Sequence, residues 1–574
     1  MKNRLFLMIA VLALASMVLA ACGPAPTAAP EAPTPTEAPA AAPTTAPAYE
    51  GLNVEAPNCD YGGEFKSIKA IDEFTVEFTL CVPDPAMPSK IAFSAFSIQP
   101  QEYLESTGAT GDILENPIGT GPYKLEAWER GNQVVFSAND DYWGDKALGK
   151  TLVFRWSTES AQRLLELQSG AVDAIDNPGP DDFTKIEADS TLTLYPREGM
   201  NVFYVGFNNN PTAEGWDNTK NPLANEKVRQ AIAMGIDRQR IVDEFYPPGS
   251  VIADYFTPCS IPNGCVGDPW YAFDVAAAKA LLTEAGYPNG FDTTLNYRDV
   301  VRGYLPDPNV VAVDIQAQLK NNLNINLKIE VMESGAFLDA ADSGQLTGIH
   351  LLGWGADYPD QTNFLGYHFG AGASKQFGDK FTDITEALDK GAQLADDAAR
   401  KPFYEAANNA IRTHVPMIPV AHGGSGVATK AVVTGGHASP LGNERFSVMS
   451  NGTDTFVWMQ NAEPISLFCA DETDGESLRA CEQVLESLLA YKTGGTAVEP
   501  SLAESYEAST DLMTWTFHLR QGVKFHDGSS LDANDVVTSL ALQWDAASPL
   551  HKGNTGAFSY WSGLFGAFLN APPQ

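Results

Sequence analysis

The sequence predicts an α/β protein of two or three lobes. Segments in which apolar residues alternate, as they do in strands, are interleaved with segments of helical periodicity, an order typical of α/β folds. The chain has 574 residues. Once an apolar N-terminal segment and a Pro- and Ala-rich stretch are set aside, about 525 residues remain, more than one hydrophobic core commonly serves.

The first 22 residues have the pattern of a lipoprotein signal peptide. Lys2 and Arg4 precede an apolar run, and Leu19-Ala20-Ala21-Cys22 forms a lipobox. Cleavage before Cys22 leaves a thiol for diacylglycerol attachment, so we expect an extracytoplasmic protein anchored to a bacterial membrane without spanning it. The alternative is an ordinary signal peptide with an incidental cysteine.

Residues 23–50 are almost entirely Pro, Ala, Thr and Glu. Such a composition cannot bury enough apolar surface to offset the entropy of ordering. We expect a disordered tether that holds the globular part away from the membrane.

Three segments alternate as half-buried strands do: FTVEFTL (74–80), LVFRW (152–156) and TWTFHLR (514–520). The second leads into a helical pattern over residues 161–168, which Gly170 ends. These strand and helix patterns are the elements on which the α/β prediction rests.

Two further helices carry N-terminal capping signals. Asp274 precedes a helix with Val275, Ala278 and Leu282 on its inner face. Asp532 and Asp535 have the spacing of an N-cap residue and its N3 partner at the start of another helix.

Charge and motifs exclude several classes of function. The net charge of −36 argues against nucleic acid or anionic lipid head groups as partners, because both require basic patches. GTGPY (119–123) lacks the following GK[ST] of a phosphate-binding loop, and Ser425 lacks the framing of a serine nucleophile. We expect no enzyme activity and no cofactor. A metal held by His414 and His422 is an alternative, but no carboxylate cluster accompanies them.

Six cysteines remain once Cys22 is assigned to the lipid anchor, an even number in an exported protein. Proximity suggests the pairs Cys259 with Cys265 and Cys469 with Cys481, and Cys59 then pairs with Cys81 by elimination. The rival hypothesis, a metal site, lacks CxxC or clustered Cys/His spacing.

Residues 498–540 closely resemble a segment found near the N-terminus of family 5 extracytoplasmic solute-binding proteins, the peptide and nickel class that feeds ABC importers. Here that segment comes last. The segments that normally follow it, resembled by residues 68–80 and 116–131, come first. The chain therefore resembles a circularly permuted member of the family. The alternative is an artefact of sequence assembly.

The resemblance implies a type II periplasmic-binding-protein fold, in which two principal lobes are hinged around a cleft and a third, smaller lobe is split by the permutation. The implied boundaries are 51–115 with 491–574 for the smaller lobe, 116–208 with 416–490 for the large lobe, and 209–415 for the opposing lobe.

GWGADYPDQTNFLGYHF (353–369) resembles the family motif that binds the α-amino group of a peptide. Trp354 and Asp357 fall on its aromatic and its carboxylate, and Tyr358 is a further candidate. A desolvated ammonium needs a fixed counter-charge. Alternatively, Asp357 braces the loop. Tyr297 and Arg302 form a second candidate cluster, in which Arg302 could meet a ligand carboxylate or form a surface salt bridge.

The resemblance implies a lipid-anchored receptor that binds short peptides by hinge closure and presents them to an ABC permease. We expect it to act as a monomer. An oligosaccharide is the alternative ligand within the class, because relatives bind sugars through aromatic faces. An exported hydrolase would need an activated nucleophile or paired catalytic carboxylates, which the sequence does not supply.

Overall fold

The computed structural model describes residues 49–209 and 221–572. The expected signal peptide, Cys22 and nearly all of the expected tether lie outside the described residues. Within those ranges, no helix is both long enough and apolar enough to cross a membrane.

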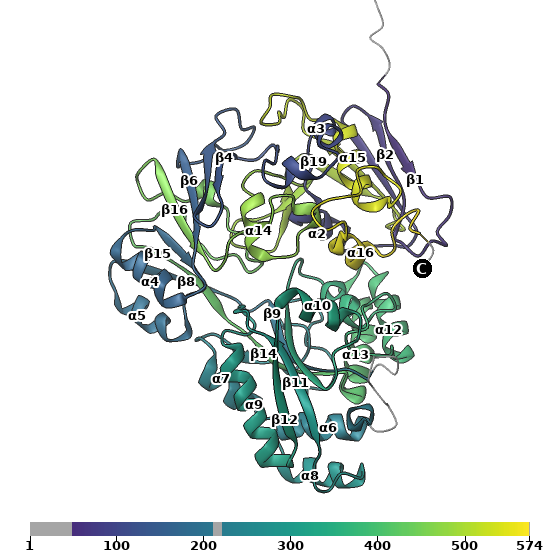
Figure 1. The fold of residues 1–574 in the computed structure, drawn as a ribbon. Coiled ribbons are helices and arrows are strands. Elements are labelled where there is room, and N and C mark those ends of the chain that lie inside the picture. The colour runs from purple at the N-terminus through teal and green to yellow at the C-terminus, as the bar shows by residue number, and fades with distance from the viewer. Residues whose placement is uncertain (1–48, 210–220, 573–574) are drawn as a thin grey trace, which may run out of the picture. The chain divides into compact units, whose positions relative to one another are not determined.

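A five-stranded antiparallel sheet, here called the small sheet, joins the two ends of the chain (Figure 1). Its central pair brings Trp515 opposite Phe78 and Phe517 opposite Val76. Segments 74–80 and 514–520, each expected to be a strand, are therefore neighbours in one sheet. In spatial order its strands are β1 (Asn53–Glu55), β2 (Phe65–Asp72), β3 (Thr75–Leu80), β20 (Thr514–Leu519) and β19 (Ala503–Ala508).

The two ends of the described chain lie at opposite ends of helix α15 (Ala533–Trp544). Leu52 N donates to Asn534 Oδ1 at the start of this helix, whereas Asn570 Nδ2 donates to Asp545 Oδ1 just after its end. Twelve helical residues span about 18 Å. Gly51 and Asn570 thus lie in one lobe, toward opposite ends of this helix.

A seven-stranded mixed sheet, the large sheet, packs beside the small one. Its middle strand β16 runs parallel to both β6 and β7. The strands in spatial order are β4 (Tyr123–Glu129), β5 (Gln133–Ala138), β6 (Thr151–Trp156), β16 (Thr455–Gln460), β7 (Ala174–Asp176), β15 (Ser425–Lys430) and β8 (Leu192–Arg197).

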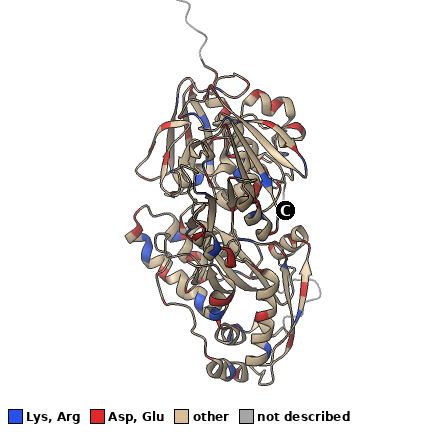
Figure 2. Ribbon diagram, turned by 90° about the vertical axis from the view of Figure 1, so that its left-hand side faces the viewer, with Lys and Arg blue, Asp and Glu red and all other residues tan. Residues whose placement is uncertain are grey.

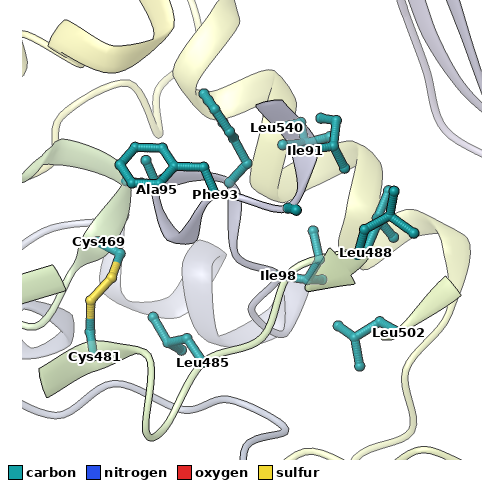
Figure 3. Packing of buried hydrophobic residues seen from close by; sticks show 14 of the residues in the cluster. Ile91, Phe93, Ala95, Ile98, Cys469, Cys481, Leu485, Leu488, Leu502 and Leu540 are labelled. Carbon is teal, nitrogen blue, oxygen red and sulfur yellow. A yellow bond between two sulfur atoms is a disulfide. The ribbon is translucent and has the colours of Figure 1, made fainter. Parts of the chain in front are cut away.

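The small and large sheets share a single hydrophobic core, so together they form what we call the first lobe. Figure 3 shows this core where Ile91 and Phe93, from the N-terminal part, pack with Leu488, Leu502 and Leu540 from the C-terminal part. The smaller lobe expected as a separate unit is therefore continuous with the large lobe. A two-stranded ribbon, β17 (Leu489–Tyr491) with β18 (Val498–Pro500), completes it.

The second lobe has its own core and a six-stranded sheet. Its strands in spatial order are β10 (Val251–Ile252), β14 (Met417–His422), β9 (Asn201–Phe207), β13 (Ile349–Gly355), β11 (Asp292–Arg298) and β12 (Asn326–Met332).

The boundaries expected at residues 208 and 416 are displaced, because β9 and β14 belong to the second lobe. They pair with each other, and β9 also pairs with β13. Residues 202–207 are all buried, as a central strand requires.

The chain therefore crosses between the lobes at residues 198–200 and again at 423–424. A Cβ on Gly199 would lie only 2.7 Å from Gly423 O, so glycine permits the close approach of the two crossings. Asn201 ties them together, donating from Nδ2 to Gly423 O and accepting at Oδ1 from Gly423 N.

The local capping signals act as expected. Asp274 caps α8 by accepting from Ala277 N, and Asp532 with Asp535 forms a capping box on α15. Gly170 ends α4 in the left-handed conformation.

The helices cover the faces of the sheets. Those of the first lobe are α2 (Met87–Ile91), α3 (Gln101–Thr107), α4 (Ser160–Ser169), α5 (Phe183–Ala188), α14 (Gly475–Cys481), α15 and α16 (Ser559–Phe565). Those of the second lobe are α6 (Glu226–Gly235), α7 (Arg238–Phe245), α8 (Val275–Glu284), α9 (Pro308–Leu323), α10 (Ser334–Asp342), α11 (Tyr367–Phe369), α12 (Thr382–Ala392) and α13 (Asp397–His414). Short helical turns are η1 (Ser94–Phe96), η2 (Gly111–Leu114), η3 (Pro180–Asp182), η4 (Pro222–Ala224), η5 (Thr362–Gly366), η6 (Phe446–Val448) and η7 (Cys469–Asp471).

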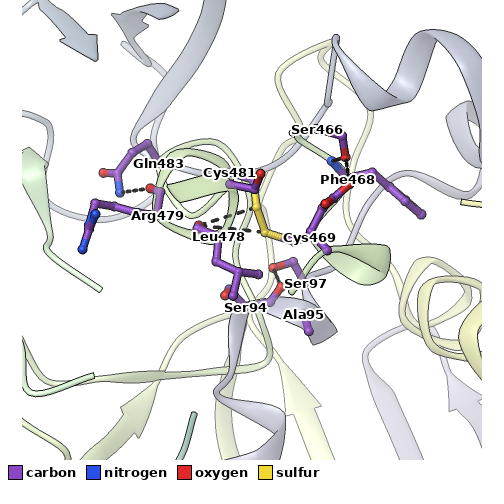
Figure 4. The surroundings of a disulfide bond; sticks show 12 residues. Ser94, Ala95, Ser97, Ser466, Phe468, Cys469, Leu478, Arg479, Cys481 and Gln483 are labelled. Carbon is purple, nitrogen blue, oxygen red and sulfur yellow. Dashed lines mark hydrogen bonds between the residues drawn. A yellow bond between two sulfur atoms is a disulfide. The ribbon is translucent and has the colours of Figure 1, made fainter. Parts of the chain in front are cut away.

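All three expected disulfides form. Their Cα–Cα distances are 5.5 Å for Cys59–Cys81, 5.0 Å for Cys259–Cys265 and 6.2 Å for Cys469–Cys481. Figure 4 shows the last of these joining η7 to the end of α14, with Leu478 and Ser94 beside it. Acidic residues are spread over both lobes rather than gathered at one place (Figure 2).

Candidate functional site

The candidate motif lies at the end of β13, where the second lobe faces the first. Strand β13 pairs with β9, which places Trp354 opposite Val202. The chain then leaves the sheet, and a loop over residues 356–361 leads into η5. Asn201 of β9 bonds to Gly423 at the second lobe crossing, so this loop lies close to the two crossings.

Asn363 fixes the conformation of this loop. Its Oδ1 accepts from Asp357 N at 2.9 Å and from Trp354 Nε1 at 3.3 Å, and its Nδ2 donates to Asp357 Oδ2 at 2.8 Å. Asn363 is fully buried. It holds the aromatic and the carboxylate of the motif in one arrangement, a role that sequence reasoning did not assign to it.

Asp357 is a buried carboxylate without a cationic partner. Only 9% of the residue is exposed, and no ion pair joins it to a Lys or Arg of the described chain. Burial raises the pKa of its carboxyl to about 7, and the hydrogen bonds from Asn363 and Tyr560 oppose that rise. A buried carboxylate in this state favours a cation placed against it.

Tyr560 reaches Asp357 from the opposite lobe. It lies on α16, at the lower edge of the first lobe in Figure 1, and its hydroxyl donates to Asp357 Oδ1 at 2.9 Å. Its ring packs edge-on against Phe93, with the ring centroids 4.7 Å apart. The hydrogen bond between Tyr560 and Asp357 joins the two lobes. Sequence reasoning missed it because 203 residues separate the partners.

Trp354 is half-buried and stacks on Tyr367, with ring centroids 4.3 Å apart. Helix α16 packs closely over this pair, since a Cβ on Gly563 would lie 2.4 Å from the Tyr367 ring. One face of Trp354 is therefore occupied by a protein side chain.

Tyr358 lies in the core of the first lobe rather than on an open surface. It is 1% exposed, and its hydroxyl bonds with that of Thr362 at 3.0 Å. Asp360 is held by Arg400 through two contacts of 2.6 and 2.8 Å. Both side chains therefore anchor the loop.

The second candidate cluster does not converge on Asp357. Tyr297 is buried on β11, and its hydroxyl donates to Asn309 Oδ1 at 2.5 Å. Arg302 reaches across to the first lobe and contacts Glu476 Oε1 at 3.5 Å. Arg302 thus forms a second link between the lobes.

The first-lobe wall near Arg302 is acidic. Asp474 caps α14, but its Oδ2 is buried and has no hydrogen-bond partner in the described chain. Burial raises the pKa of Asp474 to about 6 and that of Glu472 to about 7. Positive groups are therefore favoured along this wall.

The metal alternative finds no support in the geometry. His414 lies between Glu226 and Asp383, with both contacts at 3.0 Å, whereas the Nδ1 of His422 bonds with Asn201 O. Strand β14 lies between the two histidines and spans about 20 Å. Across the described ranges, no group of three or more His, Cys, Asp or Glu side chains is placed to hold a metal.

Comparison with known proteins identifies the relatives of this chain. It is 30% identical to the dipeptide-binding protein of Escherichia coli K12 over 393 residues, which is 67% of this chain and 71% of that protein. It is 28% identical to heme-binding protein A of Haemophilus influenzae, over 66% of this chain and 69% of that protein.

Among solved structures, a periplasmic binding protein associated with an ABC transporter of Helicobacter pylori, in complex with the peptide STSA, superimposes with a TM-score of 0.59. The two are 27% identical, and the match covers 67% of this chain and 74% of the other.

The profile described as bacterial extracellular solute-binding proteins, family 5 middle, matches residues 34–376 and 497–560, together well over half of the chain. The proteins of this family bind solutes for ABC importers and are not enzymes. The chain therefore belongs to the family 5 extracellular solute-binding proteins.

Proposed function

We propose that the chain is an extracytoplasmic receptor that binds short peptides and presents them to the permease of an ABC importer. The observation that carries the proposal is the Asp357 carboxylate, buried between the lobes beside Trp354 without a cationic partner. The α-amino group of a peptide supplies that cation. Two relatives, a dipeptide-binding protein and a protein solved in complex with the peptide STSA, support this ligand class.

We expect the lobes to close around the ligand, because candidate binding residues lie on the facing sides of both lobes. Asp357 and Trp354 stand on the second lobe, and Tyr560, Asp474 and Glu476 stand on the first. Rotation about the crossings at 198–200 and 423–424 separates the walls, and the ligand enters before they meet. The closed form offers one surface made of both lobes to the permease.

The ligand ammonium would change the protonation of Asp357. An adjacent positive charge lowers the pKa of a carboxyl, here from a starting value of about 7. Peptide binding near pH 6 would therefore release a proton from Asp357, and the resulting ion pair would be well shielded from water.

Calorimetric titration tests the ligand class. Asp357→Asn should weaken binding of a dipeptide by about one to three orders of magnitude, because an ammonium loses its counter-charge. An N-acetylated dipeptide should bind the original protein as weakly as the free peptide binds the variant. Asp389→Asn is the control, since burial also raises the pKa of Asp389, which lies on α12.

An oligosaccharide ligand would give another pattern. Trp354→Ala would then reduce affinity more than Asp357→Asn, because stacking on the ring would carry the binding. Unchanged peptide affinity in both variants would remove this loop from the binding site and contradict the proposal.

The proposed receptor is anchored through a lipid on Cys22, with residues 23–50 as its tether. Cys22→Ser should move the protein from the detergent-rich to the aqueous phase in a phase-partition assay. Retention of the variant with membranes would contradict the lipid anchor and leave the peptide-binding proposal untouched.

We also propose that the order of segments is circularly permuted relative to the family. The pairing of β3 with β20 supports this order, because it rebuilds one sheet from the two ends of the chain. Mass spectrometry of the native protein offers a direct test. The tryptic peptide that begins at Phe446 contains residues 447–455, where a permutation would join the former ends of the chain, and its absence would favour an assembly artefact.

A further inference from the structure

A polar cavity of about 150 Å³ lies inside the first lobe, separate from the loop that carries Asp357. Its walls come from the segment after α14, the ribbon of β17 and β18, the neighbourhood of Tyr142, and η1. No residue of the second lobe lines it. Engineered cavities of about this volume hold a molecule the size of benzene, so there is room for a small organic ligand.

The wall of this cavity is negative. Its charged lining consists of Glu444, Glu482, Glu486 and Glu499 with one guanidinium, that of Arg445. Arg197 and Arg479 neutralise Glu444 at 2.6 and 2.8 Å.

Arg445 is itself paired with Glu499 at 3.3 Å. Glu482 and Glu486 therefore have no ion pair with a Lys or Arg of the described residues.

These two carboxylates differ in their hydrogen bonding. Glu486 accepts from Thr120 Oγ1, Tyr142 and Trp143 at 2.7, 2.7 and 2.9 Å, so neutral donors satisfy it. Glu482 has no comparable set of donors. Burial raises the pKa of its carboxyl to about 7, and the first group to oppose that rise is the nearby Ser94.

Ser94 lies beside Glu482 in the same cavity. It lines the cavity and is only 5% exposed, yet its Oγ forms no hydrogen bond of normal geometry with any described residue. A buried hydroxyl of this kind costs free energy unless a partner is supplied. Ser94 lies beside the Cys469–Cys481 disulfide, which fixes the end of α14 (Figure 4). Glu482 follows Cys481 directly in the sequence.

We propose that this cavity is a second ligand site, which takes a small primary ammonium compound bearing a hydroxyl group. The ammonium lies between Glu482 and Glu486, and the hydroxyl bonds with Ser94. An ammonium ion provides three donors, which match two carboxylates and one further oxygen. A bare metal ion does not fit, because no metal-ligating cluster occurs within the described residues.

Ethanolamine is the probe, and ethylene glycol, with the same number of heavy atoms, is its uncharged control. Titration of the mature protein by ligand-observed NMR should show saturable ethanolamine binding and at least tenfold weaker binding of ethylene glycol. Glu482→Gln, which preserves shape, should weaken ethanolamine binding by about tenfold or more, and Ser94→Ala by a smaller factor. Glu507→Gln, on the exposed side of β19, should change nothing.

The peptide site provides an internal check. Asp357→Asn should leave ethanolamine affinity unchanged, and dipeptide binding by Glu482→Gln should show that this variant is folded. Equal affinity for ethanolamine and ethylene glycol would overturn the proposal. So would an ethanolamine affinity of Glu482→Gln equal to that of the original protein. A crystal soaked with ethanolamine that shows only ordered water in the cavity would overturn it as well.

Discussion

The hydroxyl of Tyr560 donates to Asp357 Oδ1 at 2.9 Å, and this hydrogen bond joins the first lobe to the second. The same carboxylate is the proposed partner of the ligand ammonium. Lobe closure and ligand recognition therefore converge on one side chain, and this relationship can be tested from each side.

Tyr560→Phe should loosen closure while keeping the ring against Phe93. A hydrogen bond to a charged group contributes about 1.5–3 kcal/mol, so peptide affinity should fall by roughly tenfold or more. Small-angle scattering of the ligand-free variant should show a larger radius of gyration. Tyr506→Phe, at a partly exposed position of the edge strand β19, is the control. Unchanged scattering and affinity would show that the contact does not stabilise the closed form.

Asp357 should make stability depend on pH in the absence of ligand. Its folded-state pKa is raised from 3.8 to about 7, so the folded protein binds the proton more tightly than the unfolded chain does. This contribution to stability is complete below pH 4 and is lost as pH rises through 7.

Since Glu472, Glu482 and Asp535 have pKa values raised to similar levels, the measurement is a comparison with Asp357→Asn. Chemical denaturation between pH 5 and pH 8 should show a shallower loss of stability in the variant. A saturating dipeptide should remove the difference in slope. Parallel curves without ligand would mean that Asp357 is ionised in the folded protein throughout this range.

Arg302 should act through Glu476 rather than on the carboxylate of the ligand. Arg302→Gln and Glu476→Gln should then each reduce affinity modestly, and the double variant should lose no more than the larger single effect. A dipeptide and its C-terminal amide should be affected equally. A selective loss for the free carboxylate in Arg302→Gln would instead assign this side chain to the ligand.

The two ends of the chain should unfold as one unit. Phe78 and Phe517 are fully buried, and their ring centroids lie 5.1 Å apart on paired strands β3 and β20. Phe517→Ala should cost about 3–5 kcal/mol of unfolding free energy, whereas Glu507→Ala, at an exposed position of β19 opposite Thr516, should cost little. A double-mutant cycle between Phe78 and Phe517 should give a coupling energy clearly different from zero. Additive effects would show that the two strands do not share a core.

Much of the local structure could be predicted because its determinants are close together in the sequence. A cap such as Asp274 bonds with an amide three residues away, and Cys259 and Cys265 are separated by a short turn. The alternation in residues 74–80 and 514–520 likewise fixes which side chains face a core. Trp354 and Asp357 could likewise be predicted as neighbours in one binding motif, because they are three residues apart and the motif resembles that of the family.

Other predictions required knowledge of which distant segments meet. Tyr358 follows Asp357 directly, yet it is buried in the core of the opposite lobe, because the loop inserts there. Strand β9 was expected in the large lobe, but its six buried residues gain partners only beside β13 and β14. Glu482 and Ser94, 388 positions apart in the numbering, line one cavity.

The class of fold, the three disulfides, the helix caps and the family resemblance could thus all be predicted from the residues alone. These depend on short-range spacing and on residue type. Which carboxylates are desolvated, and which of them are paired, depends instead on how the folded chain packs. Whether Asp357, Asp474 or Glu482 is paired depends on side chains that arrive from remote parts of the chain, and desolvation is a property of the packed protein rather than of any segment of it.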